Sequence, residues 1–79
     1  MKKFGIIGYG RFGTLWSTCL APYGEVIVYD EKLSATPRKL SSRVAIVSLE
    51  RVVAVDMLFL AVPVSLFAEC CHRIAPLLS

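Results

Sequence analysis

Three glycines in a six-residue stretch near the N-terminus have the spacing of a phosphate-binding turn. Residues 8–13 read Gly-Tyr-Gly-Arg-Phe-Gly, a pattern that binds the pyrophosphate of a dinucleotide when it joins a strand to a helix. Gly8 permits a tight turn, Gly10 lets the phosphates approach the backbone, and Gly13 lets the helix pack closely on the strand. The N–H groups and the positive dipole end of that helix would then face the pyrophosphate.

The remaining residues of the turn have less specific roles. A positive charge at a helix N-terminus is unfavourable unless an anion lies there, so Arg11 favours a contact with the pyrophosphate over a solvated position. Tyr9 and Phe12 are predicted to be packing residues. Phe12 is expected to be buried, as the first residue of the apolar face of the helix.

An acidic residue, Asp30, ends the next predicted strand at the distance expected of a dinucleotide site. Its carboxylate can accept hydrogen bonds from both hydroxyls of the adenosine ribose, and it would repel a 2′-phosphate. The sequence therefore favours NAD over NADP as the cofactor. Lys32, Arg38 and Lys39 could neutralise a 2′-phosphate, so NADP stays open.

The segment Ala61–Pro63 ends the fourth predicted strand, which would lie beside the first strand where ligands bind in such sheets. Its backbone is expected to line the path of the nicotinamide ribose, although Pro63 can also be a simple strand stop. The predicted cofactor-binding residues are Gly8, Tyr9, Gly10, Arg11, Phe12, Gly13, Asp30, Ala61, Val62 and Pro63.

Apolar, β-branched runs predict four strands, which are residues 3–7, 25–29, 43–47 and 56–62. The fourth is apolar on both faces, as a parallel sheet covered by helices requires. The stretch 31–42 has no clear period and is predicted to be a connecting loop, with room for a helical turn.

Three helices are predicted between and after these strands. The first follows the glycine turn, and its apolar face comprises Phe12, Leu15, Trp16, Cys19 and Leu20. Ser48 would cap a brief helix that runs to residue 54. Ser65 would cap the last helix, on which Phe67, Cys70, Cys71, Ile74 and Leu78 share one side and Glu69 and Arg73 are spaced for an ion pair.

Alternating strands and helices predict an α/β fold, a Rossmann-like doubly wound parallel sheet with strand order 3-2-1-4. Residues 1–79 would be one partial dinucleotide-binding domain, truncated after the fourth strand and its following helix. In that case strand 56–62 becomes an unpaired apolar edge, which is a template for association. We therefore expect self-association through this strand.

The composition and the charge pattern narrow the classes of protein to which the chain can belong. Of the 79 residues 56% are hydrophobic, which for so short a chain suggests a piece of a larger protein or a buried face. No apolar run reaches the length of a membrane span, and no signal peptide is recognisable, so a cytoplasmic protein is expected. The net charge of +3 comes from scattered basic residues, which does not favour nucleic-acid binding. The cysteines have no metal-binding spacing and are expected to be reduced thiols.

Two blocks of sequence, residues 5–13 and 56–65, resemble the N-terminal domain of prephenate and arogenate dehydrogenases. This resemblance implies an oxidoreductase of tyrosine biosynthesis that oxidatively decarboxylates its substrate and passes hydride to NAD(P). The family's catalytic histidine, substrate-binding arginines and dimerisation domain have no counterpart here. His72, the only histidine, is given no catalytic role. We expect this chain alone to bind the cofactor without turnover.

Two other interpretations stay open. In the first, the chain is a stand-alone nucleotide-binding module that senses NAD(H) without catalysis. In the second, it is a degenerate Rossmann remnant that serves in assembly. Binding of the nicotinamide dinucleotide separates the first from the second.

Overall fold

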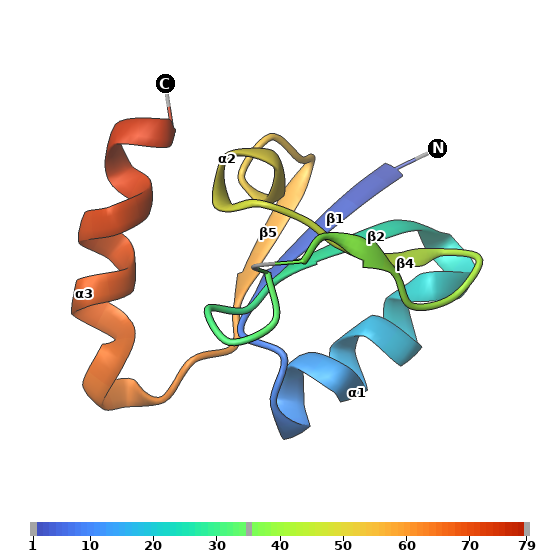
Figure 1. Cartoon of the computed structure of the whole chain (residues 1–79), viewed down its shortest axis with the longest axis horizontal. Coiled ribbons are helices and arrows are strands. Elements are labelled where there is room, and N and C mark those ends of the chain that lie inside the picture. Colours follow the sequence, from blue (N-terminus) through green and yellow to red (C-terminus); the bar gives the residue numbers. More distant parts are fainter. Residues whose placement is uncertain (1, 35, 79) are drawn as a thin grey trace.

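Most of the described strands form where apolar residues predominate. The computed structural model describes residues 2–34 and 36–78, and Figure 1 shows its helices and strands. The strands are β1 (Lys2–Ile7), β2 (Gly24–Tyr29), β3 (Arg38–Lys39), β4 (Val44–Ile46) and β5 (Met57–Leu60). The helices are α1 (Arg11–Leu20), α2 (Leu49–Val52) and α3 (Val64–Ile74), with 3-10 turns at Ala21–Tyr23 and Ala75–Leu77.

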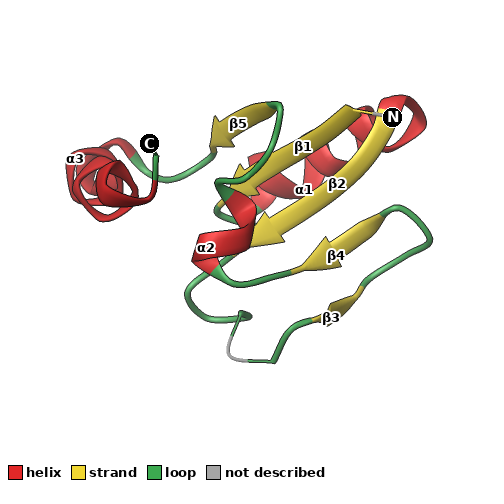
Figure 2. Cartoon of the chain, turned by 90° about the horizontal axis from the view of Figure 1, so that it is seen from above, coloured by secondary structure: helices red, strands yellow, loops and turns green. Residues whose placement is uncertain are grey.

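The described strands form one sheet in the order β3-β4-β2-β1-β5. β1 pairs with β2 and β5, and β2 pairs with β4, all in parallel. The predicted α/β fold is therefore confirmed, and the four parallel strands lie in the predicted order. The sheet differs from the prediction only at its edge, where β3 is added (Figure 2).

The prediction of a loop throughout residues 31–42 was wrong. Arg38 and Lys39 pair antiparallel with Ile46 and Ala45, and the N–H of Leu40 donates to the carbonyl of Val44 at 2.8 Å. Both residues of β3 are charged and exposed. Short, charged strands protect the edges of natural sheets, and such a strand has no hydrophobic alternation to reveal it in the sequence.

The core consists of one apolar cluster on each face of the sheet, because successive side chains of a strand point to opposite faces. α1 covers the first cluster, whereas α2 and the end of α3 pack on the second. This arrangement places helices on both faces of the sheet (Figure 2). The first cluster comprises Phe4, Ile6, Val26, Val28 and Val44, and the second Ile7, Ile27, Val47, Val52 and Ile74.

The predicted buried face of α1 was right only at Trp16 and Leu20, which contact the sheet. Gly13 and Ser17 face the sheet, while Phe12 is 71% exposed. The helix lies so close to β1 that a Cβ atom on Gly13 would overlap the carbonyl oxygen of Gly8. Only small residues fit that contact, so Phe12 and Leu15 turn outward. Trp16 stacks on Phe59 of β5 with ring centroids 5.0 Å apart.

Several predicted boundaries also differ. The fourth strand covers Met57–Leu60, not 56–62, and just before its start the Asp56 carboxylate accepts a hydrogen bond from the Lys3 N–H at 2.8 Å. α3 begins at Val64 with Pro63 in the N-cap position, so Ser65 is not its cap.

α2 is shorter than predicted, and α3 buries little of its apolar side. α2 is a single turn without a side-chain cap from Ser48. On α3 only Ile74 is fully buried. No helix in the described part of the chain is both long and apolar enough to cross a membrane.

Candidate dinucleotide-binding site

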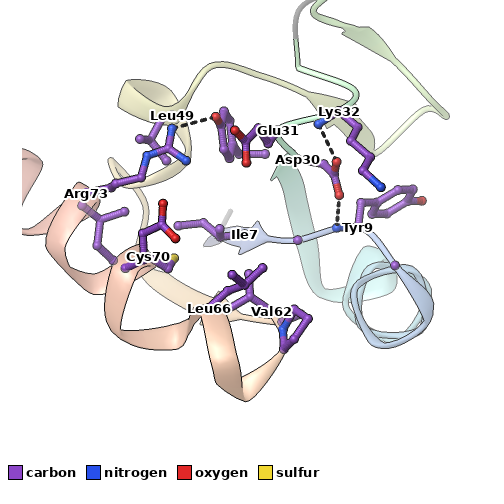
Figure 3. A pocket seen from close by; sticks show the side chains of 17 residues that line it. Ile7, Tyr9, Asp30, Glu31, Lys32, Leu49, Val62, Leu66, Cys70 and Arg73 are labelled. Atoms are coloured by element: carbon purple, nitrogen blue, oxygen red, sulfur yellow. Dashed lines mark hydrogen bonds between the residues drawn. The ribbon is translucent and has the colours of Figure 1, made fainter.

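A cavity of about 370 Å³ opens between the ends of β1, β2 and β5 and one side of α3 (Figure 3). Three short segments from these strand ends contribute to its lining, together with side chains of α3. The predicted residues that line this cavity are Gly8, Tyr9, Gly10, Asp30, Ala61, Val62 and Pro63. Arg11, Phe12 and Gly13 lie outside the lining.

The turn after β1 is shaped by Gly8. Its φ angle is +98°, a conformation that favours glycine because other residues carry a Cβ atom that collides with the backbone. A Cβ atom there would also stand 2.5 Å from the carbonyl oxygen of Ala61. The Gly8 N–H donates to the Tyr29 carbonyl at 2.7 Å. Gly8 thus brings the ends of β1, β2 and β5 together.

Gly10 has a different environment from Gly8 and Gly13. A Cβ atom on Gly10 would meet no heavy atom within 4 Å, so packing within the chain does not require glycine there. Gly10 is the N-cap of α1, whose first turn has no acidic residue and no hydrogen bond from a capping side chain. The first N–H groups of a helix have no partner within it. The space beside Gly10 is therefore open next to the first N–H groups of α1.

Asp30 is held in place by the backbone on both sides. The Tyr9 N–H donates to one carboxylate oxygen at 2.9 Å, and the Lys32 N–H donates to the other at 2.9 Å (Figure 3). The Asp30 N–H itself donates to the Ser34 hydroxyl at 3.0 Å. Each carboxylate oxygen has a further lone pair, so the group can still accept hydrogen bonds from a ligand.

The other residues of the turn pack or face solvent. Tyr9 packs against the first apolar cluster, and its hydroxyl lies 3.4 Å from the Ser17 hydroxyl. Arg11 and Phe12 are exposed in the first turn of α1. The prediction that Phe12 is buried was therefore wrong, whereas Tyr9 is a packing residue as expected.

Sequence reasoning missed the contribution of α3 to the cavity. Leu66, Glu69, Cys70 and Arg73 line it from that helix, and Glu31 lines it from the loop after β2. The sequence did contain a signal for these α3 residues. They are spaced by three or four positions, which places their side chains on one face of a helix, and that helix begins directly after the Ala61–Pro63 segment.

Arg73 contacts the strand and not its predicted partner Glu69. Its guanidinium donates to the Tyr29 hydroxyl at 3.1 Å and lies 5.8 Å from the centroid of that ring. The hydrogen bond to Tyr29 and the charge of that group raise the pKa of Arg73 above its ordinary value, with smaller contributions from Glu31 and Glu69. Arg73 is therefore a permanent cation at the edge of the cavity.

The thiols and the histidine offer no metal site. Burial and the neighbouring Cys71 raise the pKa of the Cys70 thiol, and Arg73 partly opposes this effect. Among the described residues, no group of three or more His, Cys, Asp or Glu side chains is placed to hold a metal ion. His72 is exposed on α3 and does not line the cavity.

Comparisons with known proteins agree with this arrangement at the level of the family. The chain matches no curated protein and no solved structure. The family described as NADP oxidoreductase, coenzyme F420-dependent, matches residues 3–79. The match covers the glycine turn, the strand that ends at Asp30 and all of α3. The chain therefore belongs to this oxidoreductase family and is a Rossmann-like NAD(P)-binding domain.

Proposed function

We propose that this chain holds the adenosine and pyrophosphate half of a nicotinamide dinucleotide, with NAD preferred to NADP. The observation that carries the proposal is the open space at Gly10 in front of the N-terminus of α1. Gly8 and Gly13 are explained by close contacts within the chain, and Gly10 is not. A ligand that approaches the backbone at this point accounts for the remaining glycine, Gly10.

The proposed roles follow the order of groups along the dinucleotide. The N–H groups at Gly10 and Arg11 would donate to the pyrophosphate, which suits the positive end of the helix dipole. Arg11 adds a positive charge nearby. Asp30 would accept hydrogen bonds from the adenosine ribose, and the Ala61–Pro63 backbone would border the path toward the nicotinamide. Bound there, the cofactor supplies hydride transfer.

Charge at the ribose end supports NAD. Asp30 is followed by Glu31, and both line the cavity. Two carboxylates would repel the doubly charged 2′-phosphate of NADP, since like charges in a partly desolvated site raise the binding free energy. Lys32 also lines the cavity and opposes this effect with one positive charge. The two negative charges outweigh the one positive charge, which favours the free 2′-hydroxyl of NAD.

Calorimetric titration of the chain with NADH and NADPH tests this proposal. We expect NADH to bind about tenfold more tightly, which corresponds to about 1.4 kcal/mol. Asp30→Ser should narrow that ratio. Glu50→Gln, on α2 and away from the cavity, also removes one acidic charge and should leave the ratio unchanged. Tighter binding of NADPH would refute the preference for NAD, and binding of neither would refute the proposal as a whole.

A second candidate concerns the substrate of the oxidoreductase. Residues 5–13 and 56–65 resemble prephenate and arogenate dehydrogenases. These blocks contain the end of β1 and all of β5, which are paired strands that end at the cavity. Formation of NADH from prephenate or arogenate by a protein that contains this chain would support this assignment. NADH binding without turnover of either substrate would instead favour the sensing module.

A further inference from the structure

The cavity extends beyond Asp30 to the contact between α3 and β2. Arg73 and Tyr29 line the same cavity as Gly10 and Asp30. Figure 3 shows Arg73 on the opposite side of the cavity from Tyr9 and Asp30. A ligand that contacts the glycine turn and Asp30 therefore has room to continue toward Arg73.

Arg73 is fixed in orientation, although its side chain is exposed. The hydrogen bond of 3.1 Å to the Tyr29 hydroxyl and the position 5.8 Å from the ring centroid hold the guanidinium beside a strand residue. Tyr29 itself packs against the second apolar cluster. A guanidinium is planar and weakly hydrated, so its faces stack on aromatic groups. Arg73 thus offers a flat cationic surface with a fixed support.

The remaining groups at this end of the cavity suit the base of a nucleotide. Leu66 and Ile74 provide apolar surface from α3. Glu31 and Glu69 also line the cavity, and their carboxylates can accept hydrogen bonds from an exocyclic amine. A flat group with apolar faces and a donor at its edge matches this lining.

We propose that Arg73, positioned by Tyr29, is a stacking surface for the adenine base and makes the site select purine over pyrimidine nucleotides. The inference rests on the proposed function, because the ribose at Asp30 and the pyrophosphate at Gly10 direct the base toward α3. A larger ring system makes more van der Waals contacts with the side chain on which it stacks. A purine therefore gains more from Arg73 than a pyrimidine does.

Titration of the full chain with ADP and UDP tests this inference, because these ligands share the ribose and diphosphate and differ only in the base. ADP should bind several-fold more tightly than UDP. Arg73→Leu should weaken ADP binding by about tenfold and UDP binding much less, which removes the selectivity. Arg73→Lys should not restore it, since an ammonium group has no planar face.

Two further variants isolate the effect of Arg73 on the preference for ADP over UDP. Arg51→Leu removes the same charge from the exposed surface of α2, outside the cavity, and should leave both affinities unchanged. Tyr29→Phe keeps the ring in the core and removes only the hydroxyl that anchors Arg73, so it should reduce the preference for ADP. If Arg73→Leu does not fold, Tyr29→Phe alone tests the role of Arg73.

The outcomes separate this inference from the function on which it rests. ADP binding with an ADP-to-UDP ratio that neither Arg73→Leu nor Tyr29→Phe changes would overturn the stacking role and leave dinucleotide binding intact. Equal binding of ADP and UDP by the unchanged chain would overturn it as well. Absence of ADP binding would overturn both proposals.

Discussion

Gly10 and Gly13 belong to the same six-residue turn, yet a side chain at the two positions has opposite physical consequences. A Cβ atom at Gly13 overlaps the backbone of Gly8, whereas one at Gly10 extends into open space. The sequence pattern predicted both glycines from their spacing. It could not show that Asp30 is also tied to the Tyr9 and Lys32 N–H groups, because those contacts depend on how the loop after β2 folds.

Alanine substitutions at these two glycines should therefore have different effects on the stability of the chain. Gly13→Ala should lower the free energy of unfolding by about 2 kcal/mol or more, since the helix must move off the strand. Gly10→Ala should change it by less than about 0.5 kcal/mol. Urea denaturation followed by circular dichroism measures both. Equal losses of stability would contradict the distinct environments of the two glycines.

At the scale of elements, the strands were predicted better than the faces of the helices. Apolar runs place β1, β2, β4 and β5 within one or two residues, because burial on both faces of a sheet leaves a continuous signal. The apolar residues of α1 suggested a buried face that the helix uses only in part, through Trp16 and Leu20. The close approach at Gly13 selects the face with small residues, and hydrophobic periodicity does not register such a contact.

The orientation of α1 can be tested through Phe12 and Ser17. Phe12→Ser should change the free energy of unfolding by less than about 0.5 kcal/mol, because the ring is exposed. Ser17, only 2% exposed, should not tolerate a larger residue, and Ser17→Leu should cost about 1–3 kcal/mol through overpacking. Thermal or urea unfolding of the two variants provides the comparison. A larger loss for Phe12→Ser would restore the face predicted from the sequence.

Over the whole molecule, the order of parallel strands was predictable from the alternation of elements, since crossover connections are right-handed and short. The cavity was only half predictable. Its strand-end side comprises residues expected from the glycine pattern, whereas the α3 side depends on the path of the chain after Pro63. Local sequence carries little information about such a path, and Arg73 was found only in the structure.

β5 is paired with β1 alone among the described strands, and it carries exposed apolar side chains such as Met57, which is 49% exposed. We propose that the chain self-associates through this edge, because unpaired apolar strands recruit other strands. Met57→Lys should shift the chain toward the monomer in light scattering. Val64→Lys adds the same charge outside β5 and should have little effect. A chain that is already monomeric at tens of micromolar would contradict this proposal.

In the proposed function the glycine turn receives the phosphates of a nicotinamide dinucleotide. Nuclear magnetic resonance of the 15N-labelled chain, titrated with NADH, reports on this contact at single residues. We predict saturable shifts of the Gly10 and Arg11 amide signals together with those around Asp30, and little change at β3. No saturable shift at the turn, or shifts confined to other parts of the chain, would contradict the account.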